Sequence, residues 1–237
     1  QRMDRVEMAR RLARWLMAPA PSASTVAATA GWQSDEGAFV DWARFRLLGG
    51  DELPELSQAY SAARAAVIAR RDAFAQPFAQ ALIQWNSQTP GADGRLVPVE
   101  AVLDQVVAPI ATNHPVMLLV IDGLSTSIFR ELFARVASLG WAEMVPTDIG
   151  RPLFGVAALP TVTEVSRASL LCGRLTLGAA AQEKSGFAAH AALLARSRAE
   201  APPRLFHKGD LADSTNLSPD VRAAIANPRQ LVVGVVY

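Results

Sequence analysis

The sequence predicts an α/β protein, in which a helical region, residues 1–110, precedes a partial doubly wound and mostly parallel sheet over residues 111–237. Two observations support this class. Apolar residues recur at helical spacing through the first region. After Pro115, short and continuously apolar runs alternate with helical patterns, which is typical of parallel strands covered by helices.

The helical region opens with an amphipathic pattern at residues 3–17, where arginines are interleaved with apolar side chains. We expect a second helix to begin at Ser34, because two acidic residues would then lie in its first turn, where the helix dipole favours carboxylates. A Gly-Gly pair at residues 49–50 would end this helix.

The longest helical pattern covers residues 55–85, with a kink or a break expected at Pro77. A turn-rich connector at residues 88–94 separates it from a short helix at about residues 99–110. Apolar and aromatic side chains recur along these helices, and packing alone explains such stripes.

The pattern changes at residue 116. Residues 116–121 form a continuous apolar run, which predicts a strand buried on both faces. Asp122-Gly123 then predicts a turn, residues 125–138 a helix and residues 143–146 a short strand. This order predicts a βαβ unit with a right-handed crossover.

The later elements continue the alternation of strands and helices. We expect a weak strand at residues 154–159, a short helix capped by the Thr163 hydroxyl at 163–171, a loop at 178–184, a helix at 187–199, a short strand at 205–207, a helix at 219–226 and a buried strand at 231–237. Because a domain rarely stops on a buried strand, we expect the chain to be a piece of a longer protein. In a doubly wound sheet ligands bind at the carboxyl ends of strands, and Asp122 follows such an end.

Charge and cysteine content exclude several classes of protein. The 23 basic and 22 acidic residues give a formal net charge of +1, so the chain as a whole has no attraction to nucleic acid or to an anionic membrane. The single cysteine cannot form an internal disulfide. The sequence has neither a signal-peptide pattern nor a run of about 20 apolar residues. We therefore expect a cytoplasmic protein that does not enter the membrane.

Asp122 is the first candidate for chemistry. A carboxylate directly after a buried strand is costly unless a positive group meets it, and a divalent cation is a common solution. Gly123 would let the chain turn sharply and keep the approach to the carboxylate open. The alternative is structural, because aspartate often serves at such a position as a turn former or a helix cap.

Thr163 is the second candidate, at the end of the motif Leu-Pro-Thr-Val-Thr that begins at Leu159. A hydroxyl at a helix start lies near unpaired backbone N–H groups, which suits a phosphoryl group. Threonine alone is a poor nucleophile, but a metal ion bound to its oxygen would favour the alkoxide. The alternative is that the hydroxyl only caps the helix.

Together, residues 116–123 and 159–173 resemble the first two motifs of the alkaline-phosphatase superfamily. Those motifs are an apolar strand that ends in Asp-Gly, and Pro-x-x-Thr at a helix start. Within the superfamily the chain looks most like PglZ-type proteins of bacteriophage-exclusion (BREX) systems, over roughly residues 115–237. Further stretches that resemble these proteins are Glu131-Leu132, residues 182–187 and residues 205–211.

The resemblance implies a sheet of the alkaline-phosphatase type, with Asp122 as a metal ligand and Thr163 as the metal-bound nucleophile. The implied activity is hydrolysis of a phosphate ester, in particular a phosphodiester in a nucleotide or nucleic acid. The implied cofactor is a divalent metal, zinc first, with manganese and magnesium as alternatives. The implied partners are other phage-defence components, such as a DNA methyltransferase, a kinase and ATPases.

In the superfamily the remaining metal ligands, Asp and His residues, follow a later strand. The resemblance therefore implies that they lie beyond Tyr237. We expect the 237 residues alone to be inactive for this reason.

Several other residues near the motifs have a structural and a functional interpretation. Arg167 follows the threonine by one helical turn and could reach a phosphoryl oxygen, although an ion-paired surface role is the simpler alternative. Glu164 could act as a general base, but the helix dipole also explains an acid there. His207 and Asp210 lie between the motifs and are expected to be structural or exposed. Cys172 lacks the Pro-x-Arg that follows a sulfatase cysteine, so we expect a buried and unreactive thiol.

Other functions stay open at this point. The chain could be a catalytically inactive scaffold of the same fold that binds other defence-system proteins. It could also belong to a phosphomutase or a nucleotide pyrophosphatase of the superfamily. An NTPase is disfavoured, because the sequence has no Gly-x-x-x-x-Gly-Lys phosphate loop.

Overall fold

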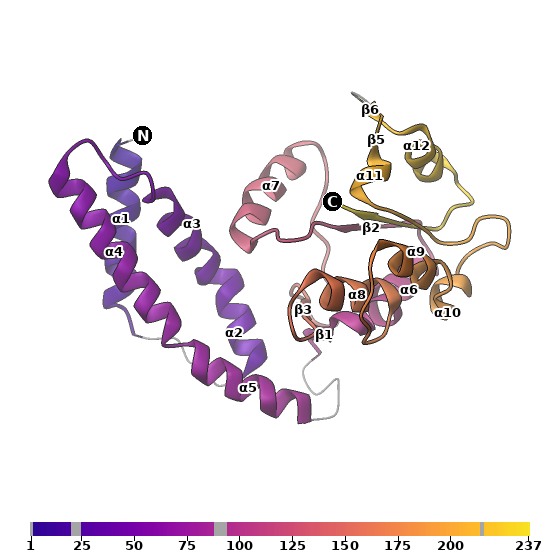
Figure 1. The fold of residues 1–237 in the computed structure, drawn as a ribbon, viewed down its shortest axis with the longest axis horizontal. Helices are drawn as coiled ribbons and strands as arrows, with labels where there is room; N and C mark the ends of the chain where they lie inside the picture. The colour runs from indigo at the N-terminus through magenta and orange to yellow at the C-terminus, as the bar shows by residue number, and fades with distance from the viewer. Residues whose placement is uncertain (1, 20–24, 88–93, 214–215) are drawn as a thin grey trace. The chain divides into compact units, whose positions relative to one another are not determined.

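The computed structural model describes residues 2–19, 25–87, 94–213 and 216–237. It shows a mixed α/β protein with many helices and small, mostly parallel sheets (Figure 1). The chain folds into two compact units. Unit 1 consists of Gln1–Asp93 and Leu124–Pro152, and unit 2 consists of Gly94–Gly123 and Leu153–Tyr237. The predicted connector lies outside the described residues except for its last position.

The units are bounded differently from the predicted regions 1–110 and 111–237. Residues 94–110 pack with unit 2, whereas residues 124–152, which follow the first strand of the predicted sheet, pack with unit 1. The chain therefore passes between the units three times, and each unit is built from two separate segments.

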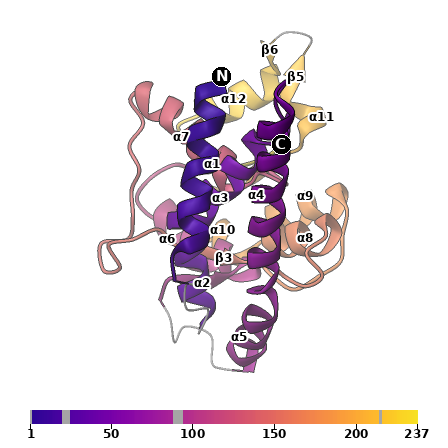
Figure 2. The ribbon, with the colours of Figure 1, turned by 90° about the vertical axis from the view of Figure 1, so that its left-hand side faces the viewer.

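Unit 1 is helical in its described part. Its elements are α1 (Arg2–Met17), α2 (Val26–Trp32), a π-helical turn η1 (Gln33–Gly37), α3 (Ala38–Arg46), α4 (Pro54–Asp72), α5 (Ala75–Ser87) and α7 (Thr126–Ser138). α1 packs against both α3 and α4 (Figures 1 and 2). Leu12, Val40, Leu47 and Tyr60 are buried in the core that these helices share, as their apolar periodicity predicts.

The second helix begins earlier than predicted, at Val26 rather than at Ser34. The Thr25 hydroxyl caps it by accepting a hydrogen bond from the Ala28 N–H. The helical path then continues through η1 into α3 without an interruption. The two acidic residues that suggested a helix start therefore lie inside a longer helical segment.

The expected break near Pro77 is present, but it comes before the proline. α4 ends at Asp72 and α5 begins at Ala75, so Pro77 falls in the first turn of α5. A proline is tolerated in a first turn, because the N–H that it lacks would have no partner within the helix.

Unit 2 contains all the strands that the structure describes. They are β1 (Leu96–Pro98), β2 (Val116–Val120), β3 (Phe154–Val156), β4 (Arg204–Phe206), β5 (Ala212–Asp213), β6 (Asn216–Leu217) and β7 (Val232–Val236). Its helical elements are η2 (Val99–Ala101), η3 (Leu103–Val107), α6 (Ala108–Ala111), η4 (Thr163–Arg167), α8 (Ala168–Cys172), α9 (Ala180–Ala188), α10 (Ala191–Leu194), α11 (Lys208–Leu211) and α12 (Pro219–Ala226). Within the described parts of both units, every helix is too short or too polar to cross a membrane.

The main sheet has the strand order β2-β7-β4, and its three strands are parallel. β7 is central and buried along its whole length, and Gly234 leaves space there for Leu205 and Phe187. β2 is an edge strand, and Met117 and Leu119 on one of its faces are 48% and 50% exposed. The prediction that this strand is buried on both faces is therefore wrong.

The predicted βαβ unit is not formed. Residues 143–146 are not a strand, and β2 pairs with β7 instead. The helix expected at residues 125–138 is present as α7, but it packs with unit 1, where Glu131 accepts hydrogen bonds from Trp42 and Arg46. β3 occupies the weak strand candidate and pairs with β1 in a separate parallel sheet.

The prediction of a loop at residues 178–184 is wrong from Ala180 onward, because α9 begins at that residue. The Gln182 side chain stabilises this helix start by accepting a hydrogen bond from the Ala179 N–H. α9 and α10 replace the single helix expected at residues 187–199. The predicted elements near residues 205, 219 and 232 are confirmed as β4, α12 and β7.

Candidate functional site

Asp122 lies at the carboxyl end of β2. Its N–H donates to the Tyr237 carbonyl oxygen at 3.1 Å, which extends the pairing of β2 with β7. Gly123 has a φ of 74°, and a Cβ at that position would have nothing within 4 Å, so the turn favours glycine and leaves open space. Ser125 caps the following helix by accepting from the Ile128 N–H. The helix-cap alternative for Asp122 is therefore wrong, whereas the turn-former alternative stays open, because Asp122 and Gly123 lie in a turn.

Thr163 begins η4, and its hydroxyl donates a hydrogen bond to Asp122 Oδ2 at 3.0 Å. The N-cap position belongs to Val162, and no side chain caps the helix. The prediction that the Thr163 hydroxyl caps the helix is therefore wrong. The structure brings the two candidate residues together at one carboxylate oxygen, although 41 positions separate them in the sequence.

Arg167 lies one turn further along and joins the same carboxylate. Its Nη1 is 3.1 Å from Asp122 Oδ2, and its Nε donates to Glu183 Oε1 at 3.0 Å. The side chain is 20% exposed. The planar guanidinium therefore connects an accessible carboxylate to an internal one, a task that suits arginine because its donors form a rigid fork.

Glu183 belongs to α9 and lies in the stretch 182–187 that resembles PglZ-type proteins, but the resemblance implies no role for it. Its side chain is fully buried, with Oε1 on Arg167 and Oε2 on His207 Nε2 at 2.6 Å. Burying a carboxylate is costly unless it is paired, so these two contacts explain how it is accommodated. Sequence reasoning missed it because its segment was assigned to a loop and because most glutamates are exposed.

His207 and Asp210 have structural contacts in unit 2. The His207 side chain is 13% exposed. The Asp210 carboxylate accepts from the His207 N–H at 2.8 Å and from Lys184 Nζ at 2.7 Å. The Lys184 hydrogen bond, followed by the one from the His207 backbone, lowers the pKa of Asp210. His207 thus contributes its side chain to Glu183 and its backbone to Asp210.

Two further candidates lie near Thr163 in the sequence but take no part in its contacts. The Glu164 side chain is exposed. Cys172 is buried, and its thiol lies 3.6 Å from the Gln182 carbonyl oxygen. Loss of solvent contact raises the pKa of the Cys172 thiol, which agrees with the predicted unreactive cysteine.

The oxygens of Asp122 and Thr163 fit a divalent cation as a pair. Adjacent ligands of an octahedral cation, each about 2.1 Å from the ion, are about 3.0 Å apart. The two oxygens have this separation, and both are of the kind that magnesium, manganese and zinc accept. No group of three or more His, Cys, Asp or Glu in the described residues could hold a metal. The described residues therefore place two oxygens side by side but contain no complete set of metal ligands.

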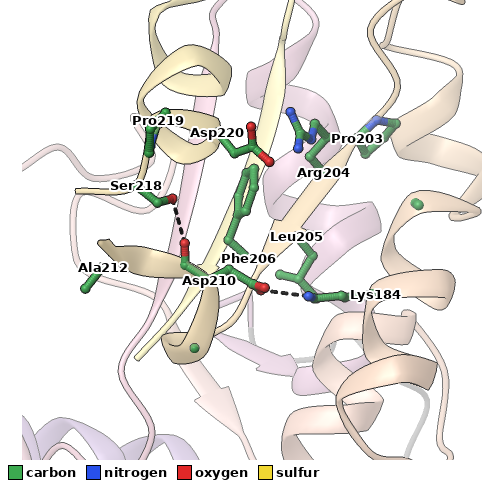
Figure 3. Close-up of a pocket in the computed structure, with 12 residues that line it drawn as sticks. Lys184, Pro203, Arg204, Leu205, Phe206, Asp210, Ala212, Ser218, Pro219 and Asp220 are labelled. Atoms are coloured by element: carbon green, nitrogen blue, oxygen red, sulfur yellow. Dashed lines mark hydrogen bonds and ion pairs between the residues drawn. The ribbon is translucent and has the colours of Figure 1, made fainter. Parts of the chain in front are cut away.

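A separate cavity of about 750 Å³ lies elsewhere in unit 2, between α9, β4, α11 and α12 (Figure 3). The Lys184–Asp210 ion pair and the Ser218 hydroxyl, which donates to the Asp210 carbonyl oxygen, form part of its wall. The central carbon of the Arg204 guanidinium lies over the Phe206 ring, 4.7 Å from the ring centroid. None of the predicted site residues lines this cavity.

No protein-family model matches this chain, and no curated protein matches its sequence significantly. The geometry of Asp122, Thr163 and Arg167 and the resemblance of their two motifs to a known superfamily are the features of this chain that bear on its function.

Proposed function

We propose that the protein hydrolyses phosphate esters, phosphodiesters in particular, with Thr163 as the nucleophile. The observation that carries this proposal is the contact between the Thr163 hydroxyl and Asp122 Oδ2 at 3.0 Å, with the Arg167 guanidinium on the same oxygen. A nucleophile, an acceptor for its hydrogen bond and a cation for phosphoryl oxygens thus lie together at the end of a parallel strand.

Each of the three side chains has a defined role in the proposed reaction. The Thr163 oxygen attacks phosphorus in line with the leaving alcohol, and the bond between phosphorus and that alcohol oxygen breaks as the new bond forms, while Asp122 accepts the hydrogen bond that orients the hydroxyl. Water then attacks the phosphothreonine, which releases the phosphate product and restores the hydroxyl. Arg167 uses two of its five N–H groups on Asp122 and Glu183, so donors remain for a phosphoryl oxygen. A divalent cation, zinc or else manganese or magnesium, would favour the Thr163 alkoxide when it is bound by the two oxygens.

The proposal includes the alkaline-phosphatase type of fold and a role of the PglZ kind. It is supported by the resemblance of the two motifs and by their meeting in space, since in that superfamily both motifs contribute to one site. Further ligands from outside the described residues are required, because two oxygens do not complete the shell of zinc or magnesium. On this proposal the protein acts in the cytoplasm with other components of a phage-defence system.

The test measures cleavage of a chromogenic phosphodiester by the purified full-length protein, which includes the residues beyond Tyr237, with added zinc or manganese. Thr163→Ala and Asp122→Ala should each lower the rate by about 10³-fold or more, because one removes the nucleophile and the other its partner. Thr161→Ala, which removes an exposed hydroxyl two positions earlier, is the matched control and should leave the rate unchanged. Full activity in both site variants would show that the site is assigned wrongly.

A second candidate function is a scaffold of the same fold that binds other defence-system proteins without catalysis. One observation favours it: Arg167 already neutralises Asp122, and the described residues lack a third metal ligand beside them. The two candidates differ in metal binding. A full-length protein that retains no zinc or manganese after dialysis, and cleaves no phosphate ester, would favour the scaffold.

A further inference from the structure

We propose that Glu183 is the positioning residue of the site, and that it holds the Arg167 guanidinium in place for a phosphoryl group. The inference rests on the proposed function and deepens it. Glu183 is fully buried on α9, and its Oε1 accepts a hydrogen bond from Arg167 Nε at 3.0 Å. Arg167 Nη1 reaches Asp122 on the other side. The arginine is therefore fixed from the interior.

Burial makes the Glu183 contact the more constraining of the two. Asp122 has a side chain that is 39% exposed, so water competes for its contact with Arg167. Glu183 has no access to water, and an unpaired carboxylate there would be very unfavourable. Arg167 consequently has one contact that solvent weakens and one that solvent does not reach. The interior contact sets the direction of the guanidinium plane.

His207 completes the arrangement on the far side of Glu183. Its Nε2 lies 2.6 Å from Glu183 Oε2, which leaves Oε1 for Arg167. The other ring nitrogen, Nδ1, is buried without a hydrogen-bond partner in the described structure. Among the described residues, Glu183 is therefore the only hydrogen-bond partner of the His207 ring. The Glu183 carboxylate lies between His207, which follows β4, and Arg167 in η4. Glu183 cannot turn away from Arg167 without also losing His207.

The first measurement is made on the unmodified protein. In ¹⁵N-edited NMR spectra the Arg167 Nε–H signal should exchange with solvent at least about tenfold more slowly than that of Arg174, whose side chain is exposed. Equal exchange rates for the two arginines would overturn the proposal, whether or not any variant folds.

The second measurement uses Glu183→Gln, which keeps the shape of the side chain and removes its charge. We expect the Arg167 Nε–H to exchange faster, because the amide oxygen of glutamine still accepts its hydrogen bond but accepts a weaker one than a carboxylate. The affinity for inorganic phosphate, measured in metal-free buffer, should fall roughly tenfold even though a negative charge has been removed beside the site, because Arg167 is held less firmly. Glu200→Gln is the matched control, because Glu200 makes a long and exposed ion pair with Arg229, and it should change neither quantity. An unchanged Arg167 signal in Glu183→Gln would overturn the proposal.

A double-mutant cycle separates positioning from a general effect on the fold. If Glu183 acts through Arg167, then Glu183→Gln should cause no further loss of phosphate affinity in an Arg167→Ala background. An equal loss in both backgrounds would contradict the inference. If the NMR signal responds as expected but the full-length protein neither binds phosphate nor cleaves the phosphodiester with added metal, Glu183 still positions Arg167 and the proposed hydrolase function is wrong.

Discussion

Asp51 in unit 1 shows how neighbouring groups set the charge of one side chain. Removal from solvent raises its pKa, but hydrogen bonds from the Leu53 N–H, Arg5 and Arg2 have a larger combined effect and lower the pKa to about 2. The carboxylate therefore connects the start of α1 to the turn that precedes α4.

This lowered pKa predicts a specific loss of stability in acid. A carboxyl whose pKa is lower in the folded state stabilises the fold above its unfolded pKa, and the effect is lost as pH falls toward the folded value. For Asp51 the window lies between pH 3.8 and about 2. The difference in unfolding free energy between the unmodified protein and Asp51→Asn should therefore shrink across this window, as measured by urea denaturation at several pH values. A difference that stays constant with pH would contradict the assignment.

At the scale of elements, the close packing of α8 on α9 depends on Gly186. A Cβ at this position would lie 2.5 Å from Cys172 Sγ and 3.2 Å from Cys172 Cα, so backbone and side chain both limit the space. α8 begins directly after Arg167, and α9 carries the buried Glu183. Their separation therefore affects the distance between these two side chains.

Gly186→Ala should lower the free energy of unfolding of unit 2 by about 1–3 kcal/mol, because overpacking outweighs the better helix propensity of alanine. Gly209→Ala in α11 is the control, since a Cβ there meets nothing within 4 Å, and it should be neutral or slightly stabilising. Chemical denaturation followed by circular dichroism measures both. A neutral result for Gly186→Ala would show that α9 can move away from α8 at little cost.

The sequence predicted elements better than it predicted their partners. Period and composition located α7, α12 and β7, because each has a strong local pattern. They could not show that α7 joins the helical unit, or that β2 pairs with the last strand, because pairing is decided by contacts far apart in sequence.

The candidate site likewise contains residues that a local pattern indicates and one residue that only distant contacts reveal. Asp122 and Thr163 were identifiable because each stands at a motif with a known resemblance, and Arg167 because it lies one turn after Thr163. Glu183 was not identifiable, because its importance comes only from burial beside Arg167 and His207. A buried carboxylate has no signature in a single sequence.

At the scale of the whole molecule, the tryptophans report on one unit only. All five lie in the segments of unit 1: Trp15, Trp32, Trp42, Trp85 and Trp141. Tryptophan fluorescence therefore follows the unfolding of unit 1, whereas circular dichroism follows both units.

Two matched core substitutions use this asymmetry. Leu12 and Leu193 are both fully buried, the first in the core of unit 1 and the second in that of unit 2. Each Leu→Ala change should cost about 2–5 kcal/mol. Leu12→Ala should shift the fluorescence transition, and Leu193→Ala should shift circular dichroism while leaving the fluorescence transition in place. A common shift in both signals would mean that the units unfold as one.

The position of β7 in the chain has a consequence for biosynthesis. β2 and β4 each pair with β7 in the main sheet, and Val116 reaches its partner only at Val232. A nascent chain leaving the ribosome can complete the helices of unit 1 while β2 still has no neighbour. Its apolar edge then stays available to chaperones or to other nascent chains until β7 is synthesised.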